Sequence, residues 1–215
     1  MVRMKRVRLT REESREQTQQ RLLDAAQSVI ARKSLAATSV EDIAAQAGYT
    51  RGAFYSNFSS KNELFIELLR RDHRHTENEM TALLQAGLGS EQIAERVQQM
   101  YSRLHGDTDC FMNWTEARML AARDARFRTR LNALMVEKCE HIAAFIADFH
   151  RQTGATPPLP PKEMAMGLMS LVEGVRLFRL SSPQDMTPVA AESILRTFLE
   201  SLLLRGRPTP GPAPK

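Results

Sequence analysis

Three residues within six positions, Thr50, Arg51 and Tyr55, have side chains suited to a nucleic acid. A guanidinium can donate two parallel hydrogen bonds to guanine O6 and N7, or hold a phosphate. The hydroxyl groups of threonine and tyrosine can donate to phosphate oxygens. Gly52 lets the backbone approach a groove wall, although it costs about 1 kcal/mol of helix propensity. The spacing therefore predicts a short helix that presents polar groups to DNA.

The segment 39–58 that must position these groups is predicted to form two short helices around a tight turn. Ser39 stands three residues before Asp42, which is typical of a capping box. The apolar residues of the first helix have the i, i+3, i+4, i+7 spacing: Val40, Ile43, Ala44 and Ala47. Gly48 ends this helix, and Phe54 with Phe58 would hold the second one. The alternative is an ordinary helical hairpin with a solvated outer face.

The distribution of charge supports a polyanionic partner at the N-terminal end. The chain has 215 residues and a net charge of +5. Residues 1–61 contain 11 basic and 6 acidic side chains, whereas the other 154 residues contain 19 of each. All the excess positive charge therefore lies in the first third. A basic N-terminal tail without a partner would give the same asymmetry.

Other features limit the class of protein. No stretch approaches the roughly 18–20 apolar residues that span a bilayer, and the N-terminus lacks the apolar core of a secretory signal. Two cysteines, Cys110 and Cys139, are too few for a disulfide framework and are expected to be buried thiols. We therefore expect a cytoplasmic protein with no membrane partner.

Metal, cofactor and catalytic signatures are weak. His73 and His75 are two residues apart and would point to different faces of a helix, as would Cys139 and His141. Neither pair alone is expected to bind a metal. The sequence has no glycine-rich phosphate loop and no nucleophile–base signature, so we expect no cofactor and no enzyme activity.

The proline distribution predicts an all-α fold. The first 156 residues contain no proline, and no segment alternates apolar and polar residues as a strand would. Apolar periodicity and capping residues predict about nine helices, at roughly 11–33, 39–47, 50–56, 60–85, 90–105, 108–122, 124–153, 161–180 and 187–205.

The last two helices have unusually wide apolar stripes. The stripes within 164–178 and 194–203 are broader than a single core contact requires. The simplest cover is the same pair of helices from a second copy, which predicts a homodimer through 161–180 and 187–205. The alternative is two central core helices in a monomer.

The stretch Ser39–Leu64, which contains DIAAQAGYTRGAFYSNFSSKNELF, resembles the signature of TetR/AcrR-family regulators. The strong likeness covers about residues 17–70. It implies a three-helix DNA-binding domain followed by a helical ligand-binding and dimerisation domain. In two positions the chain departs from the pattern: Ser56 replaces a larger aromatic residue, and Tyr49 replaces a small aliphatic one. The implied DNA-contacting set is Ser39, Tyr49, Thr50, Arg51, Gly52, Tyr55, Asn57 and Lys61.

The resemblance also implies the domain organisation. Residues 1–16 would be a basic arm and the start of the first helix, 17–61 the helix-turn-helix domain, 62–205 the effector-binding and dimerisation domain, and 206–215 a disordered Pro/Gly tail. The arm could lie along the minor groove through its four cations, Arg3, Lys5, Arg6 and Arg8.

The implied function is that of a transcriptional repressor that binds a palindromic DNA operator as a homodimer. An unknown small-molecule effector would release it. Methionines and aromatic residues make adaptable pocket walls. The candidates are Phe111, Met112, Trp114, Glu116, Met119 and Phe145, with Cys110, Phe127 and Phe149 as further wall residues, although each could equally be core. Rival interpretations are a DNA-organising protein of the same fold without an effector, and a helical enzyme with an incidental basic end.

Overall fold

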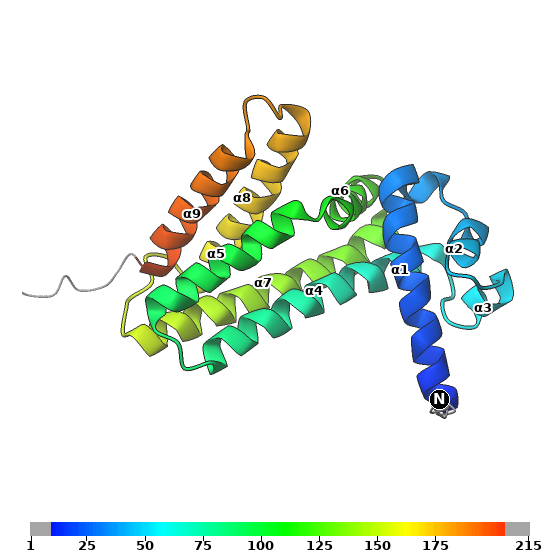
Figure 1. The fold of residues 1–215 in the computed structure, drawn as a ribbon, viewed down its shortest axis with the longest axis horizontal. Coiled ribbons are helices and arrows are strands. Elements are labelled where there is room, and N and C mark those ends of the chain that lie inside the picture. Colours follow the sequence, from blue (N-terminus) through cyan, green and yellow to red (C-terminus); the bar gives the residue numbers. More distant parts are fainter. Residues whose placement is uncertain (1–9, 205–215) are drawn as a thin grey trace, which may run out of the picture. The chain divides into compact units, whose positions relative to one another are not determined.

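The computed structural model describes residues 10–204, apart from the side chains of 104–106 and 204. Within that range the chain forms nine helices and no strand, which confirms the all-α prediction (Figure 1). The basic arm and the Pro/Gly tail lie outside the described residues. The helices are α1 (Arg11–Ala37), α2 (Val40–Gln46), α3 (Arg51–Tyr55), α4 (Lys61–Gln85), α5 (Ser90–Gly106), α6 (Thr108–Arg123), α7 (Ala125–Thr153), α8 (Pro161–Ser181) and α9 (Pro188–Leu204).

The chain divides into two compact units that interleave along the sequence. The first unit contains the residues up to Asp72 together with Met112–Leu131, and the second contains His73–Phe111 with the chain from Asn132. The boundaries of the two units fall within α4, α6 and α7. The division near residue 61 that the family resemblance implied stays a prediction about function. Each unit is described by itself below.

Helix α1 of the first unit has a kink near its end. Ser34 has a φ of 69°, in the left-handed region, so regular helical geometry ends at Lys33 as the sequence predicted. The Thr38 hydroxyl donates to the Ser34 carbonyl at 2.7 Å, and the Glu116 carboxylate accepts from the Leu35 N–H at 3.0 Å. These bonds satisfy backbone groups that the kink releases.

The core of the first unit joins α1, α4, α6 and α7. Phe65 and Phe127 stack with their ring centroids 5.9 Å apart, and both are buried. Asn113 is fully buried and donates its side-chain amide to the Gln27 carbonyl at 3.0 Å. The hydrogen bonds of Asn113 and Glu116 join α6 to α1, and α2 packs against α1.

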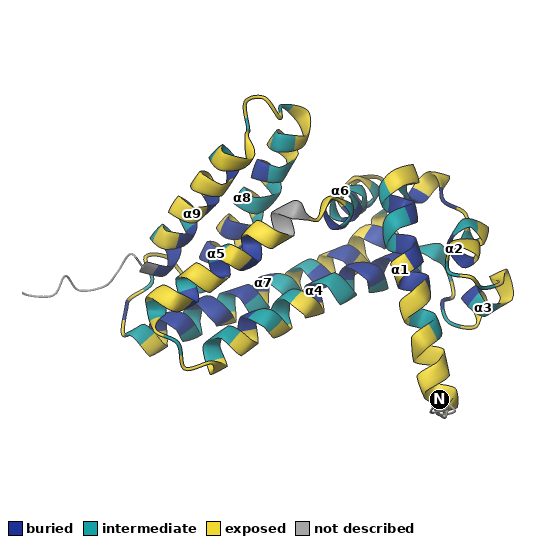
Figure 2. Ribbon diagram, in the orientation of Figure 1, coloured by how far each residue is buried: buried dark blue, intermediate teal, exposed yellow. Residues whose placement is uncertain are grey.

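The second unit has its own apolar core, built by α5, α8, α9 and parts of α4 and α7. Helices α8 and α9 run side by side in opposite directions, and α5 packs against α9 (Figure 1). Their inner faces are buried, whereas much of the outer face of α8 is exposed (Figure 2). No helix within residues 10–204 combines the length and apolar content that a membrane span requires.

Candidate nucleic-acid interface

Helix α2 begins with the capping box that the sequence predicted. The Asp42 N–H donates to Ser39 Oγ at 3.0 Å, and the Ser39 N–H donates to the Asp42 carboxylate at 2.9 Å. The hydrogen bonds from Ser39, with a further one from Lys33, hold the pKa of Asp42 below its ordinary value. Two backbone donors of the helix start are thereby satisfied, which fixes where α2 begins.

The turn between α2 and α3 depends on Gly48. Its φ of 75° lies in the left-handed region, which glycine adopts without the penalty that a side chain brings. The Tyr49 N–H then donates to the Ala44 carbonyl at 2.8 Å, which closes the turn. Thr50 caps α3, since its hydroxyl oxygen accepts from the Ala53 N–H at 3.3 Å. The tight turn and the second cap both match the sequence prediction.

Two buried rings hold α3 in place. Phe54 is fully buried and Phe58 is nearly so, with their ring centroids 5.9 Å apart. Tyr55 meets the Phe54 ring edge-on at 5.4 Å, yet remains 48% exposed. Because α3 has only five residues, its orientation depends on these aromatic contacts rather than on its own helical hydrogen bonds.

The outer face of α3 is polar and open to solvent (Figure 2). Thr50, Arg51, Gly52 and Tyr55 are all exposed, as predicted. The Arg51 guanidinium forms an ion pair with Glu41 at 2.9 Å and also lies over the Tyr55 ring at 5.5 Å. The sequence analysis missed the partnership with Glu41, because ten positions and a turn separate the two residues.

Three other expected DNA-contacting residues border this face. Ser39 is exposed, although its hydroxyl oxygen already accepts in the capping box. Tyr49 is half-buried, and its hydroxyl lies 3.5 Å from the Thr18 hydroxyl of α1. Asn57 is half-buried and donates to the Ala53 carbonyl at 2.8 Å. These residues therefore also stabilise the fold around α3.

Lys61 is oriented differently from the expectation. Its ammonium donates to the carbonyls of Leu35 and Thr38, each at 2.5 Å. Partial burial lowers the pKa of this ammonium, an effect partly offset by the Asp42 carboxylate. Lys61 thus joins the start of α4 to the end of α1, and its charge points to backbone oxygens in this structure.

The structure does not bring the expected effector-binding residues together within one unit. Phe111 and Phe145 belong to the second unit, whereas the other four belong to the first: Met112, Trp114, Glu116 and Met119. Met119 is exposed, and Glu116 accepts from the Leu35 N–H. Phe127 and Phe149, which were expected to be further wall residues, are buried in the cores of the first and second units.

Two cavities lie within the second unit. One of about 260 Å³ is lined by Phe145 with residues of α4 and α7, and one of about 170 Å³ is lined by residues of α5, α8 and α9. Phe145 is thus the one member of the expected set of six that borders either of these two cavities. The Arg176 guanidinium covers the Phe111 ring at 4.4 Å and donates to the Asp107 carbonyl at 2.6 Å.

Comparison with known families adds to this geometry. Residues 22–68 match the model for bacterial regulatory proteins of the tetR family. Residues 111–204 match the C-terminal model of BetI-type transcriptional repressors. The two matched segments contain the whole α2–turn–α3 segment and most of α6 to α9.

Individual proteins give a consistent result. The chain is 39% identical over 72 residues to the HTH-type transcriptional regulator TtgR of Pseudomonas putida. This match covers 32% of the chain and 34% of TtgR, so the chain spans about a third of that relative's length.

Two solved structures share the fold over most of their length. A TetR-family transcriptional regulator from Cytophaga hutchinsonii aligns with a TM-score of 0.68 at 18% identity, over 93% of this chain and 100% of its own. FadR from Bacillus subtilis in complex with stearoyl-CoA aligns with a TM-score of 0.69 at 18% identity, over 86% and 97%. With both family models matched and the fold shared, the chain belongs to the TetR family of bacterial regulatory proteins.

Proposed function

We propose that this protein is a ligand-responsive transcriptional repressor that inserts α3 into the major groove of an operator. The observation that carries the proposal is the exposed polar face of α3, held rigid by Phe54 and capped by Thr50. Arg51 and Tyr55 on that face supply base and phosphate contacts, with Thr50 and Gly52 beside them. Ser39, Tyr49 and Asn57 border the contact surface. A bound operator would block polymerase, and such a target implies a cytoplasmic protein.

The proposed partner is a second copy of the chain, bound through α8 and α9. Met166, Leu177 and Leu180 are about half exposed and share one side of α8, and Phe178, also about half exposed, projects from another side. Large apolar side chains exposed in a row typically mark an interface. A two-fold dimer would place the two α3 helices in successive major grooves, about 34–36 Å apart, on a near-palindromic operator.

The proposed effector is a small molecule bound in the second unit. FadR of Bacillus subtilis, a structural neighbour, was solved with stearoyl-CoA, and the cavity beside Phe145 is a starting volume for a ligand here. Because α4 belongs to both units along the chain, a ligand that alters α4 would change the DNA-binding state. A coupling of about 1–3 kcal/mol is sufficient to change operator affinity five- to hundredfold.

The experiment is a footprint on the DNA that flanks the protein's own gene, repeated at several salt concentrations. We expect a short protected palindrome whose affinity falls steeply with salt, since released counterions drive phosphate binding. Arg51→Ala should weaken binding by about 1–3 kcal/mol. A footprint that is unchanged in Arg51→Ala and does not depend on the DNA sequence would contradict the proposal. A palindromic footprint that no ligand pool weakens would instead favour a DNA-binding protein of this fold without an effector.

A further inference from the structure

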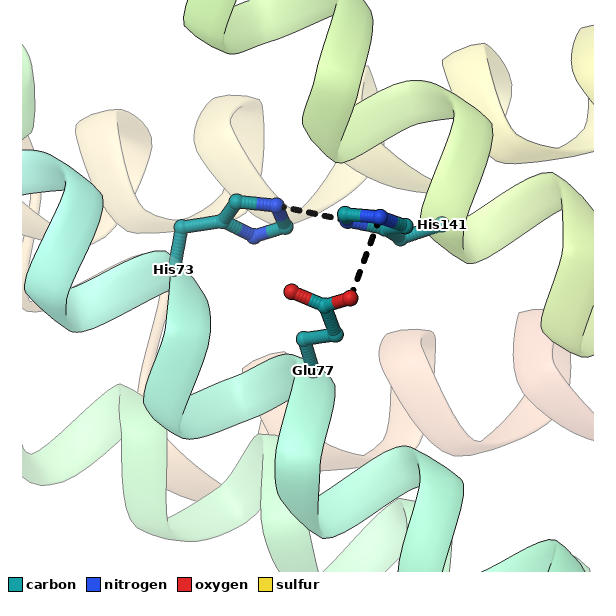
Figure 3. Close-up of side chains that lie close together, drawn as sticks. All are labelled: His73, Glu77 and His141. Atoms are coloured by element: carbon teal, nitrogen blue, oxygen red, sulfur yellow. Dashed lines mark hydrogen bonds and ion pairs between the residues drawn. The ribbon is translucent and has the colours of Figure 1, made fainter.

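Three side chains of types that can bind metal ions meet on α4 and α7 within the second unit. His73 and Glu77 are four residues apart, so both project from the same face of α4, and His141 approaches from α7 (Figure 3). His73 Nε2 lies 2.9 Å from His141 Nδ1, and His141 Nε2 lies 3.0 Å from a Glu77 carboxylate oxygen. The two imidazole rings stack, with centroids 5.1 Å apart.

This grouping differs from the histidine pairs considered in the sequence. His75 is exposed on the other side of α4, and the Cys139 thiol lies 3.8 Å from the Lys162 carbonyl. The structure instead combines one member of each pair, His73 with His141, and adds Glu77. His73 is 3% exposed, so its ring is ordered by packing as well as by hydrogen bonding.

We propose that His73, Glu77 and His141 bind a divalent transition-metal ion of the Zn²⁺ class. One ligand atom from each residue lies within 4.8 Å of the other two. A tetrahedral ion with bonds of about 2.0–2.1 Å needs ligand atoms about 3.3 Å apart. His141 can offer only one of its two ring nitrogens to an ion, so one measured contact is close to the required spacing, whereas the other ligand atoms lie within 4.8 Å. Rotation of the side chains would have to bring the third ligand atom to the ion.

The donor set selects the type of metal. Two imidazoles and one carboxylate suit Zn²⁺, Co²⁺, Ni²⁺ and Cu²⁺, whereas Mg²⁺ and Ca²⁺ prefer oxygen ligands alone. Coordination would replace the hydrogen bond between His73 and His141 by bonds to one ion. The ion would thus cross-link α4 and α7 more strongly than that hydrogen bond does.

The cavity beside the cluster provides room for a fourth ligand. Glu77 and His141 both line the cavity of about 260 Å³, next to apolar Met80, Leu84 and Phe145. Three protein ligands with one open position are typical of zinc sites that bind water or a further ligand. The open position would accept a water molecule or a donor atom of a small molecule in this cavity. The metal site goes beyond the proposed repressor function and does not depend on DNA binding.

The experiment is a metal titration of the full-length protein after chelator treatment and dialysis. In competition with a chromophoric chelator, we expect one Zn²⁺ per chain, a tetrahedral visible spectrum with Co²⁺, and no displacement by excess Mg²⁺. Loss of even an outer-shell partner typically lowers metal affinity about 10- to 100-fold. His73→Ala and His141→Ala, which each remove a ligand, should lower the affinity at least as much.

Two further variants distinguish metal coordination by these residues from hydrogen bonds that only stabilise the fold. Glu77→Gln keeps a hydrogen-bonding partner for His141 but removes the anionic ligand, so it should fold and still bind Zn²⁺ weakly. His75→Ala, on the same helix and exposed, is the matched control and should bind like the wild type. Circular dichroism checks that each variant folds. The proposal is overturned if binding is substoichiometric, if Mg²⁺ competes, or if Glu77→Gln and His75→Ala both bind like the wild type.

Discussion

The Arg51 guanidinium of α3 lies 2.9 Å from the Glu41 carboxylate of α2. In the protein without DNA, the two residues therefore form an ion pair between these helices. The Arg51 and Glu41 side chains are 65% and 57% exposed, and such exposed ion pairs contribute only about 0–1 kcal/mol. Exchange of Glu41 for a phosphate or a guanine therefore requires little free energy. The Arg51 guanidinium also lies over the Tyr55 ring, 5.5 Å from its centroid, a contact that does not involve Glu41.

Replacement of this carboxylate should strengthen DNA binding. Glu41→Gln releases Arg51 and removes a negative charge that would face the phosphates, so we expect about two- to fivefold tighter operator binding. The measurement is the dissociation constant by fluorescence anisotropy at two salt concentrations. Glu95→Gln, an exposed change on α5, is the control and should leave affinity unaltered. Weaker binding by Glu41→Gln would show that Glu41 itself helps to position Arg51 on DNA.

Removal of the ring that anchors α3 should destabilise the DNA-binding segment. Phe54 is fully buried, and truncation of a buried phenylalanine costs about 3–5 kcal/mol. Phe54→Ala should lower the free energy of unfolding in urea accordingly and abolish operator binding. Tyr55→Phe removes only an exposed hydroxyl, so it should leave stability unchanged and weaken DNA binding alone. Equal loss of stability in both variants would mean that α3 is not held as described.

Lys61 should be a structural residue more than a DNA contact. Its ammonium donates to the carbonyls of Leu35 and Thr38, and a charge-assisted bond at a partly exposed position contributes about 1 kcal/mol. Lys61→Met keeps the chain length without a donor and should lower unfolding stability by about that amount. Operator affinity of the folded protein should change less than in Arg51→Ala. A loss as large as that of Arg51→Ala would return Lys61 to the contact set that the family resemblance implied.

The proposed dimer can be tested at a glycine on α8. Gly174 is exposed, and a Cβ added there meets nothing within 4 Å. Gly174→Arg should therefore preserve the fold of each chain, and it gains about 1 kcal/mol of helix propensity. A charge inserted between two α8 helices should still convert the dimer to a monomer in light scattering after gel filtration. Gln99→Arg, at an exposed position of α5, is the control and should remain dimeric. A dimeric Gly174→Arg would argue against an interface at this part of α8.

Low pH should lower the stability of the first unit, because it protonates two hydrogen-bonded carboxylates near the starts of α2 and α4. Hydrogen bonds from the Ser39 N–H and hydroxyl lower the pKa of Asp42 from 3.8, and those from the Ser59 hydroxyl and N–H lower the pKa of Glu63 from 4.5. A carboxylate whose pKa is lower in the folded state than in the unfolded state stabilises the fold at any pH above its unfolded-state pKa. This stabilisation is lost as the pH falls through the pKa of the folded state. We therefore expect stability to decline once the pH falls below about 4.5.

The measurement is urea unfolding as a function of pH, for the wild type and for Asp42→Asn with Glu63→Gln. The double variant should start less stable at neutral pH and show a shallower acid decline. Glu95→Gln is again the control, with a decline like that of the wild type. Identical slopes for the double variant and the wild type would show that other carboxylates dominate acid unfolding.

The sequence located the helices closely because helix boundaries depend on local interactions. Ser39 with Asp42 determined where α2 begins, Gly48 where it ends, and Thr50 where α3 begins. Capping and left-handed turns involve residues at most four apart. The lack of proline before residue 157 allowed α4 and α7 to be long. The exposed face of α3 followed from the positions of Phe54 and Phe58 alone.

The side-chain partners could not be predicted, since they depend on how the helices pack. Glu41 meets Arg51 across a turn, Lys61 reaches the carbonyl of Leu35 twenty-six positions earlier, and the expected effector-binding residues are divided between two units. Periodicity shows which face of a helix is buried but not which helix covers it.

The sequence by itself therefore determined the all-α class, the helix boundaries and the family motif around α2 and α3, because these features arise from short-range spacing and from one long motif. Only the tertiary structure decided that His73 lies beside His141, 68 positions away, and that Lys61 points to backbone oxygens. The physical reason is that hydrogen bonds and metal ligation require contacts within a few ångströms, and packing alone sets such distances between helices that are remote in the chain.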